Sequence, residues 1–136
     1  MTALADANLF LRLFVNDNET LHQKAIDVFH KVEVKKLILV VRPEVIAEVV
    51  YALHSSNIYN QTRSQIYEYL FPTLQHKGIK LVERLAVETA LKIYAESNLD
   101  FVDALLIALA RNGKTKTVCS FDQDFKNIDG VQWMQP

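Results

Sequence analysis

The sequence has 136 residues, of which 50% are hydrophobic and 23% are charged, and its formal net charge is −1 at pH 7. This length suits one domain with a hydrophobic core, and this composition excludes a disordered chain. The net charge gives no sign of a nucleic-acid binder, although local cations or a bound metal can reverse the field at a small site. No run of about 18 uncharged apolar residues occurs, so we expect no membrane-spanning helix.

The start of the chain and its single cysteine favour a reducing cytoplasm. Residues 1–6 lack the basic start and apolar stretch of a signal peptide. Cys119 has no second cysteine with which to form a disulfide within the chain. Because it lies in a strand-like segment without a nearby His or Cys, we expect Cys119 to be a buried structural thiol.

Apolar runs and helical periodicity predict an alternation of strands and helices. Such an alternation indicates a single α/β domain over residues 1–136, with a parallel sheet flanked by helices on both faces. Ligand sites of such sheets lie beyond the carboxyl ends of the strands. In chain order we expect a short buried strand 2–5, helix 8–15, a helix from 18 to about 32, strand 37–41, helix 43–54, helix 61–74, strand 79–82, helix 86–97, helix 101–111, strand 117–120 and strand 131–133.

Four carboxylates occur next to apolar stretches. Asp6 and Asp122 follow predicted strands, whereas Glu48 and Asp103 interrupt apolar helical runs. An ionised carboxylate near a core is costly unless it is paired, hydrogen-bonded or bound to a metal. If the four converge in space, a divalent cation explains them together, and such acidic metal sites are suited to cleaving phosphodiesters.

Each acid also has a purely structural interpretation, and the two interpretations stay open at this point. Acids are favoured at helix N-termini and in turns, and an acid can occupy the exposed face of an amphipathic helix. In these terms Asp6 is an N-cap, Asp103 lies in the first turn of a helix capped by Asp100, Asp122 and Asp124 form a turn, and Glu48 faces solvent.

Four segments carry a family resemblance. They are residues 6–12 (DANLFLR), 45–53 (VIAEVVYAL), 99–108 (LDFVDALLIA) and 120–125 (SFDQDF). In this order and spacing the chain resembles a PIN-domain protein, and within that family a VapC-type toxin ribonuclease. Each segment is weakly diagnostic alone, whereas four in order across a chain of this length are fairly specific.

The resemblance implies a three-layer PIN-like fold with a parallel sheet of about five strands, and a metal site built from acids. The metal-site acids carry over to Asp6, Glu48, Asp103 and Asp122, with Asp124 as a less certain fifth member. Such oxygen ligands favour Mg²⁺ or Mn²⁺ over zinc. The implied activity is hydrolysis of RNA phosphodiesters by a metal-dependent endoribonuclease, the toxin of a toxin–antitoxin pair.

Neighbouring polar residues are expected to support this site. Ser120 matches a small hydroxyl residue that the family often has two positions before its last acid. The chain departs from the family at Ala7, where Thr or Ser is frequent, although Asn8 remains beside it. Arg12, Arg42 and Lys126 are candidate RNA contacts, and each is also interpretable as an ordinary surface charge.

Four tyrosines, at positions 51, 59, 67 and 69, form an aromatic segment. It is interpretable either as the core of a helical hairpin or as a protein-binding surface. The resemblance implies a homodimer and a cognate antitoxin, and we expect Tyr59 and Tyr67 to contact that antitoxin.

Other α/β classes fit less well. A phospho-acceptor receiver domain needs an acceptor Asp after its third strand, and this chain has none there. A haloacid-dehalogenase-like phosphatase needs a second Asp after Asp6-Ala7, where this chain has Asn8. The remaining alternative is a PIN-fold module that binds RNA or protein without nuclease activity.

Overall fold

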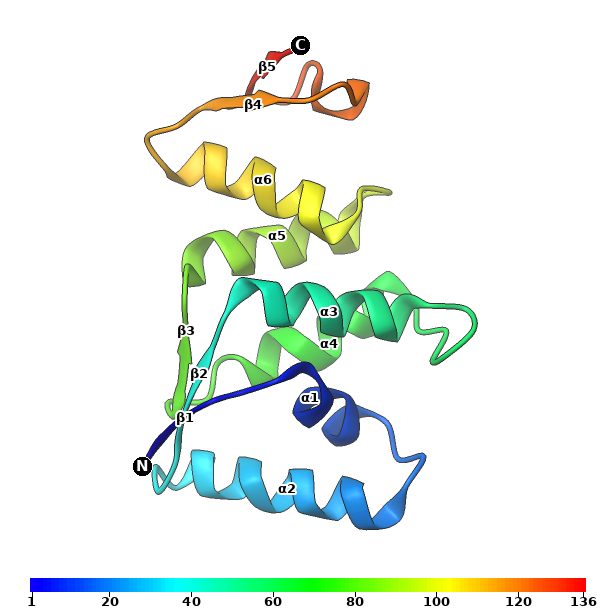
Figure 1. Ribbon diagram of the computed structural model, residues 1–136, viewed down its shortest axis with the longest axis vertical. Helices are drawn as coiled ribbons and strands as arrows, with labels where there is room; N and C mark the ends of the chain where they lie inside the picture. Colours follow the sequence, from blue (N-terminus) through cyan, green and yellow to red (C-terminus); the bar gives the residue numbers. More distant parts are fainter. The chain divides into compact units, whose positions relative to one another are not determined.

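The computed structural model describes all 136 residues and divides into two compact units, Met1–Glu83 and Arg84–Pro136. Every predicted helix and strand is present, with its ends displaced by at most two residues. The first unit contains β1 (Thr2–Leu4), α1 (Ala7–Phe14), α2 (Glu19–Glu33), β2 (Ile38–Val41), α3 (Pro43–His54), α4 (Arg63–Thr73) and β3 (Ile79–Leu81) (Figure 1). The second contains α5 (Arg84–Glu96), α6 (Phe101–Asn112), β4 (Thr117–Cys119), the unpredicted 3₁₀ helix η1 (Gln123–Phe125) and β5 (Gln132–Met134).

All strand pairs are parallel, as predicted. In the first unit β2 lies between β1 and β3, with Ala3 opposite Leu39 and Val40 opposite Lys80. In the second unit β4 pairs with β5. The five strands thus form a three-stranded and a two-stranded sheet, where the sequence predicted one sheet of about five.

Two predictions of burial are wrong. The first strand is not buried, because β1 is an edge strand and its Leu4 is 72% exposed. Cys119 is exposed. Successive side chains of a strand point to opposite faces, and in β4 it is Val118 that is buried.

Helix α1 is the element of the first unit that joins sheet, helices and candidate site. It packs against α2 and α3. Phe10 is fully buried and meets Phe29 of α2 edge to face at 5.5 Å, while Phe14 stacks on Tyr69 of α4 at 5.3 Å. These contacts hold α1, and with it the residue at its start, against the rest of the unit.

Helix ends in the first unit follow the expected capping chemistry. Asn18 caps α2 by accepting a hydrogen bond from the Leu21 N–H, and Pro43 occupies the first turn of α3. Thr62 and Gln65 form a reciprocal capping box at the start of α4.

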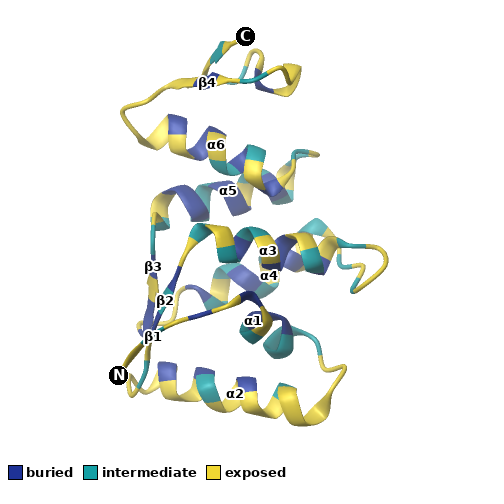
Figure 2. Cartoon of the chain, viewed as in Figure 1, coloured by how far each residue is buried: buried dark blue, intermediate teal, exposed yellow.

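The second unit is built on the packing of α5 against α6 and of α6 against β4. Tyr94 and Phe101 meet edge to face at 6.4 Å, and Ile107, Val118 and Phe125 form a core beneath the strands. Figure 2 shows buried and exposed stretches alternating along α5 and α6, as expected of amphipathic helices. Across the whole chain, every helix is too short or too polar to be a membrane span.

Candidate metal and RNA site

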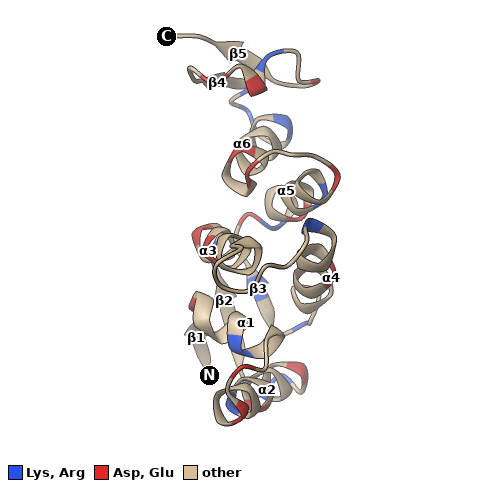
Figure 3. Ribbon diagram, turned by 90° about the vertical axis from the view of Figure 1, so that its right-hand side faces the viewer, with Lys and Arg blue, Asp and Glu red and all other residues tan.

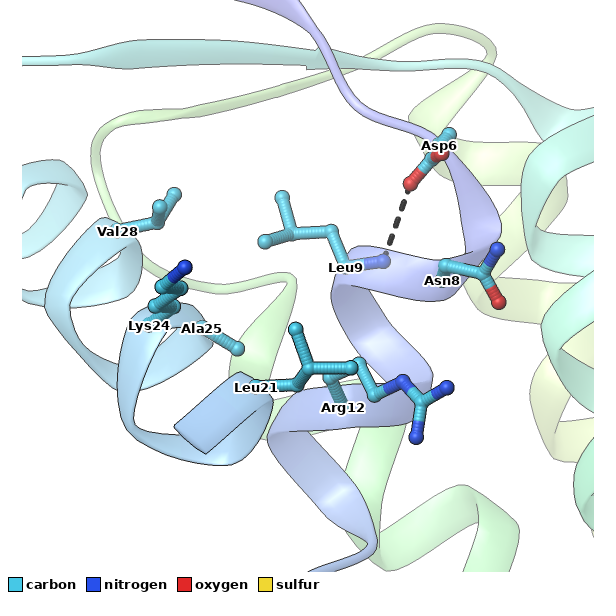
Figure 4. A pocket seen from close by; sticks show the side chains of 8 residues that line it. All are labelled: Asp6, Asn8, Leu9, Arg12, Leu21, Lys24, Ala25 and Val28. Carbon is cyan, nitrogen blue, oxygen red and sulfur yellow. Dashed lines mark hydrogen bonds between the residues drawn. The ribbon is translucent and has the colours of Figure 1, made fainter. Parts of the chain in front are cut away.

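Asp6 lies just beyond the carboxyl end of β1 and is the N-cap of α1. Its Oδ1 accepts a hydrogen bond from the Leu9 N–H at 3.1 Å (Figure 4). The side chain is exposed, and no ion pair neutralises it. One carboxylate oxygen is therefore held by the backbone, while the other is available to a cation.

Glu48 lies on the exposed side of α3. Its apolar neighbours Ile46, Val49 and Val50 are buried, and Glu48 itself is not. The interpretation of Glu48 as an acid close to the core is wrong for this structure, because the helical period turns it away from the buried face. A solvent-facing carboxylate remains usable as a metal ligand.

Arg42 and Glu44 form an exposed ion pair at the start of α3, with Nε and Oε1 3.1 Å apart. A backbone hydrogen bond and, to a smaller extent, the Arg42 guanidinium hold the pKa of Glu44 below its ordinary value. Arg42, a candidate RNA contact, is thus already engaged by an acid of its own helix.

Asp103 is the one candidate acid that is partly buried. It lies in the first turn of α6. Burial raises its pKa, and the negative charges of Asp100, Asp122 and Asp124 raise it further. The start of α6 and the segment after β4 therefore bring acids from distant parts of the sequence into electrostatic contact.

Asp122 and Asp124 lie in a tight turn after β4. The Asp122 Oδ1 accepts a hydrogen bond from the Asp124 N–H at 2.8 Å and so caps η1. Ser120 Oγ accepts a hydrogen bond from the Asp122 N–H at 3.0 Å, and the Trp133 Nε1–H donates to the Ser120 carbonyl at 2.9 Å. Ser120 thereby links the acidic turn to β5.

Neither unit by itself gathers three metal-ligating side chains in the arrangement that would hold an ion. Asp6 and Glu48 belong to the first unit, whereas Asp103, Asp122 and Asp124 belong to the second. The donor set fits a hard divalent cation, since every candidate ligand is a carboxylate and none of the ion pairs in the protein uses one of them.

The remaining candidate RNA contacts differ in their surroundings. Arg12 is the only charged residue of α1 (blue in Figure 3) and pairs with Asp17, with Nη1 and Oδ1 2.9 Å apart. Lys126 is exposed directly after η1. From the sequence, Asp100 is expected only to cap its helix, yet its negative charge contributes to the raised pKa of Asp103. The signal in the sequence for this interaction was that Asp100 lies three residues before Asp103.

Comparison with known proteins identifies the family. The model of the PIN domain matches residues 3–131, so the chain belongs to the PIN domain family. Membership confirms the predicted PIN-like α/β fold. A search of curated proteins finds no significant match.

Among solved structures, the chain is similar to one described as the crystal structure of VapBC2 from Rickettsia felis bound to a DNA fragment from their promoter. The identity is 14%, the TM-score is 0.38, and the match covers 99% of this chain and 98% of that one. Values this low define neither a substrate nor a partner for this chain.

The raised pKa of Asp103 predicts how stability depends on pH. Because its folded-state pKa lies above the unfolded value, the metal-free protein loses stability as the pH rises through the folded pKa. Asp103→Asn removes this loss, so we expect a higher melting temperature than the wild type at pH 7 in a chelating buffer. The difference should shrink below pH of about 4, where both proteins are neutral at this position.

The control for this experiment is Asp129→Asn, which removes an exposed acid of the same unit. It should leave the melting temperature unchanged at both pH values. A melting temperature of Asp103→Asn below that of the wild type at pH 7 would show that the carboxylate is a net stabilising group.

Proposed function

We propose that this protein is a metal-dependent endoribonuclease and that residues 1–136 form a single PIN domain with an acidic metal site. The observation that carries the proposal is the set of acids around Asp103, which are drawn from separate segments and lack cationic partners. The family match supports it, because it extends over both units. The four acids also lie in the four segments that resemble the VapC type.

Asp6, Glu48, Asp103 and Asp122 are the residues that would hold Mg²⁺ or Mn²⁺, with Asp124 as a further ligand. When bound, such a cation lowers the pKa of a coordinated water and stabilises negative charge on phosphoryl oxygens. Asp122 or Asp124 would orient the attacking water and accept its proton. The Ser120 hydrogen bond keeps the turn that carries both acids in place.

A toxin of a toxin–antitoxin pair is the biological role that the four-segment resemblance supports. This role implies an antitoxin partner, a homodimer and a cytoplasmic location, where cellular RNA is the substrate. A PIN module that binds without cutting is the second candidate, and a cleavage assay separates the two.

Loss of a carboxylate should abolish cleavage. In an assay with total cellular RNA and Mg²⁺ or Mn²⁺, Asp6→Asn and Asp103→Asn should each lower the cleavage rate about 100-fold or more. Mutating a residue that only hydrogen-bonds to a metal ligand typically costs about 10- to 100-fold in activity, and loss of a ligand itself should cost at least as much. Asp27→Asn, which removes an exposed acid of α2, is the control and should cleave as the wild type does. Full activity of Asp6→Asn would remove the proposed mechanism.

The proposed metal site also predicts metal-dependent stability. With Mn²⁺ at about 100 times its Kd, the free energy of unfolding should rise by about 2.7 kcal/mol, and the rise should vanish on adding EDTA. Asp6→Asn and Asp103→Asn should each lose most of this rise, because each removes a proposed ligand of the ion. If one variant keeps the rise in full, the residue it changes is not a ligand of the ion.

The aromatic segment generates a prediction about the antitoxin. Tyr59 and Tyr67 are both half-buried, so each has side-chain surface near solvent, and Tyr67 stacks on Phe71 at 5.0 Å. Tyr59→Ala and Tyr67→Ala should each weaken binding of the antitoxin encoded beside this chain about tenfold or more, measured by calorimetry. Val34→Ala, a truncation at an exposed position after α2, should have no effect. Unchanged affinity of both tyrosine variants would place the antitoxin elsewhere.

A further inference from the structure

A groove of about 370 Å³ lies between α1 and α2 and begins at Asp6 (Figure 4). Its apolar lining comes from Leu9 of α1 and from Leu21, Ala25 and Val28 of α2. This volume is within the range of small-molecule sites, and a groove with apolar walls suits a flat, weakly polar group.

Two cationic side chains, Arg12 and Lys24, also line the groove. Arg12 already pairs with Asp17, whereas none of the ion pairs in the protein involves Lys24, which is exposed. An apolar wall flanked by positive charge is complementary to a nucleotide, whose base is planar and whose phosphate is anionic.

The position of the groove selects a nucleotide over other anionic ligands. Asp6 is at once a lining residue of the groove and a candidate ligand of the catalytic metal. An RNA strand with its scissile phosphate at that metal must place an adjoining nucleotide beside Asp6. The groove is the apolar surface that begins at this point.

We propose that the groove between α1 and α2 binds the base of a nucleotide adjoining the scissile phosphate, and that Lys24 contacts the phosphate of that nucleotide. The inference rests on the proposed ribonuclease function and adds a base-binding subsite to it. A base at this position packs against the side chains of Leu9 and Leu21, so the subsite contributes to the choice of cleavage sequence.

The test measures binding separately from cleavage. The probe is a fluorescent single-stranded 12-mer RNA pool of random sequence, titrated by anisotropy with Mg²⁺ present. The protein carries Asp122→Asn in every case, so that the probe is not cut. Leu21→Glu places a negative charge in the groove, and Lys24→Ala removes a positive one.

Matched controls are available on the same helix. Ile26 has the same exposure as Leu21, 37%, and does not line the groove, so Ile26→Glu adds the same charge outside it. Lys31 is an exposed lysine of α2 away from the groove, so Lys31→Ala is the control for Lys24→Ala.

We expect Leu21→Glu and Lys24→Ala each to weaken RNA binding about tenfold, and both controls to bind within about twofold of the parent. Lys24→Ala should also reduce the slope of log affinity against log salt by about 0.7, the loss of one phosphate contact on a single strand. With Asp122 restored, mapping of the cut ends should show a changed base preference next to the cut for Leu21→Glu alone.

Two results would overturn the inference, and they are distinguishable. If the wild type cleaves RNA but Leu21→Glu binds no worse than Ile26→Glu, the groove does not hold a base and the ribonuclease function stands. If the wild type shows no metal-dependent cleavage, the proposed function and the subsite fail together.

Discussion

Backbone N–H groups at the starts of helices orient two of the candidate acids, and the proposed chemistry depends on this constraint. In a chain of parallel strands, each strand end is followed by a helix start, where unpaired N–H groups favour a carboxylate. Asp6 is held in this way by Leu9, and Asp122 by Asp124. A carboxylate has two oxygens, so capping occupies one and leaves the other for a cation. The structural and the functional interpretation of these acids are therefore compatible.

The second determinant is the lack of cationic partners for these acids. The ion pairs of the protein use Asp17, Glu44 and Glu88, none of which is a candidate ligand. Around Asp103 the neighbouring charges are negative, and they raise its pKa further than burial, the larger cause, does alone. A protein gains nothing in stability from such an arrangement without a counter-ion. The divalent cation proposed for this site would offset the repulsion.

The proposed recognition of RNA would have to come from cationic side chains that are not already engaged by acids. Arg12 and Arg42 each lie within 3.1 Å of a local acid, which lowers their value as phosphate contacts. Lys24 and Lys126 are exposed and belong to none of the ion pairs. In a chain with a net charge of −1, such lysines would provide local attraction for the proposed substrate without a basic surface overall.

The sequence by itself determined the order and bounds of the helices and strands, because capping residues, Pro43 and apolar periodicity act over a few neighbouring residues. It also determined the identity of the candidate acids and the family, because the four segments are local patterns in a fixed order. Only the tertiary structure decided which of these acids interact electrostatically. Asp103 interacts with Asp122 and Asp124, which are 19 and 21 positions further along the chain. It alone decided that Leu4 and Cys119 are exposed, that Arg42 pairs with Glu44, and that α1 and α2 leave a groove beside Asp6. These properties depend on which surfaces pack together, and contacts between distant residues leave no signature in a local pattern.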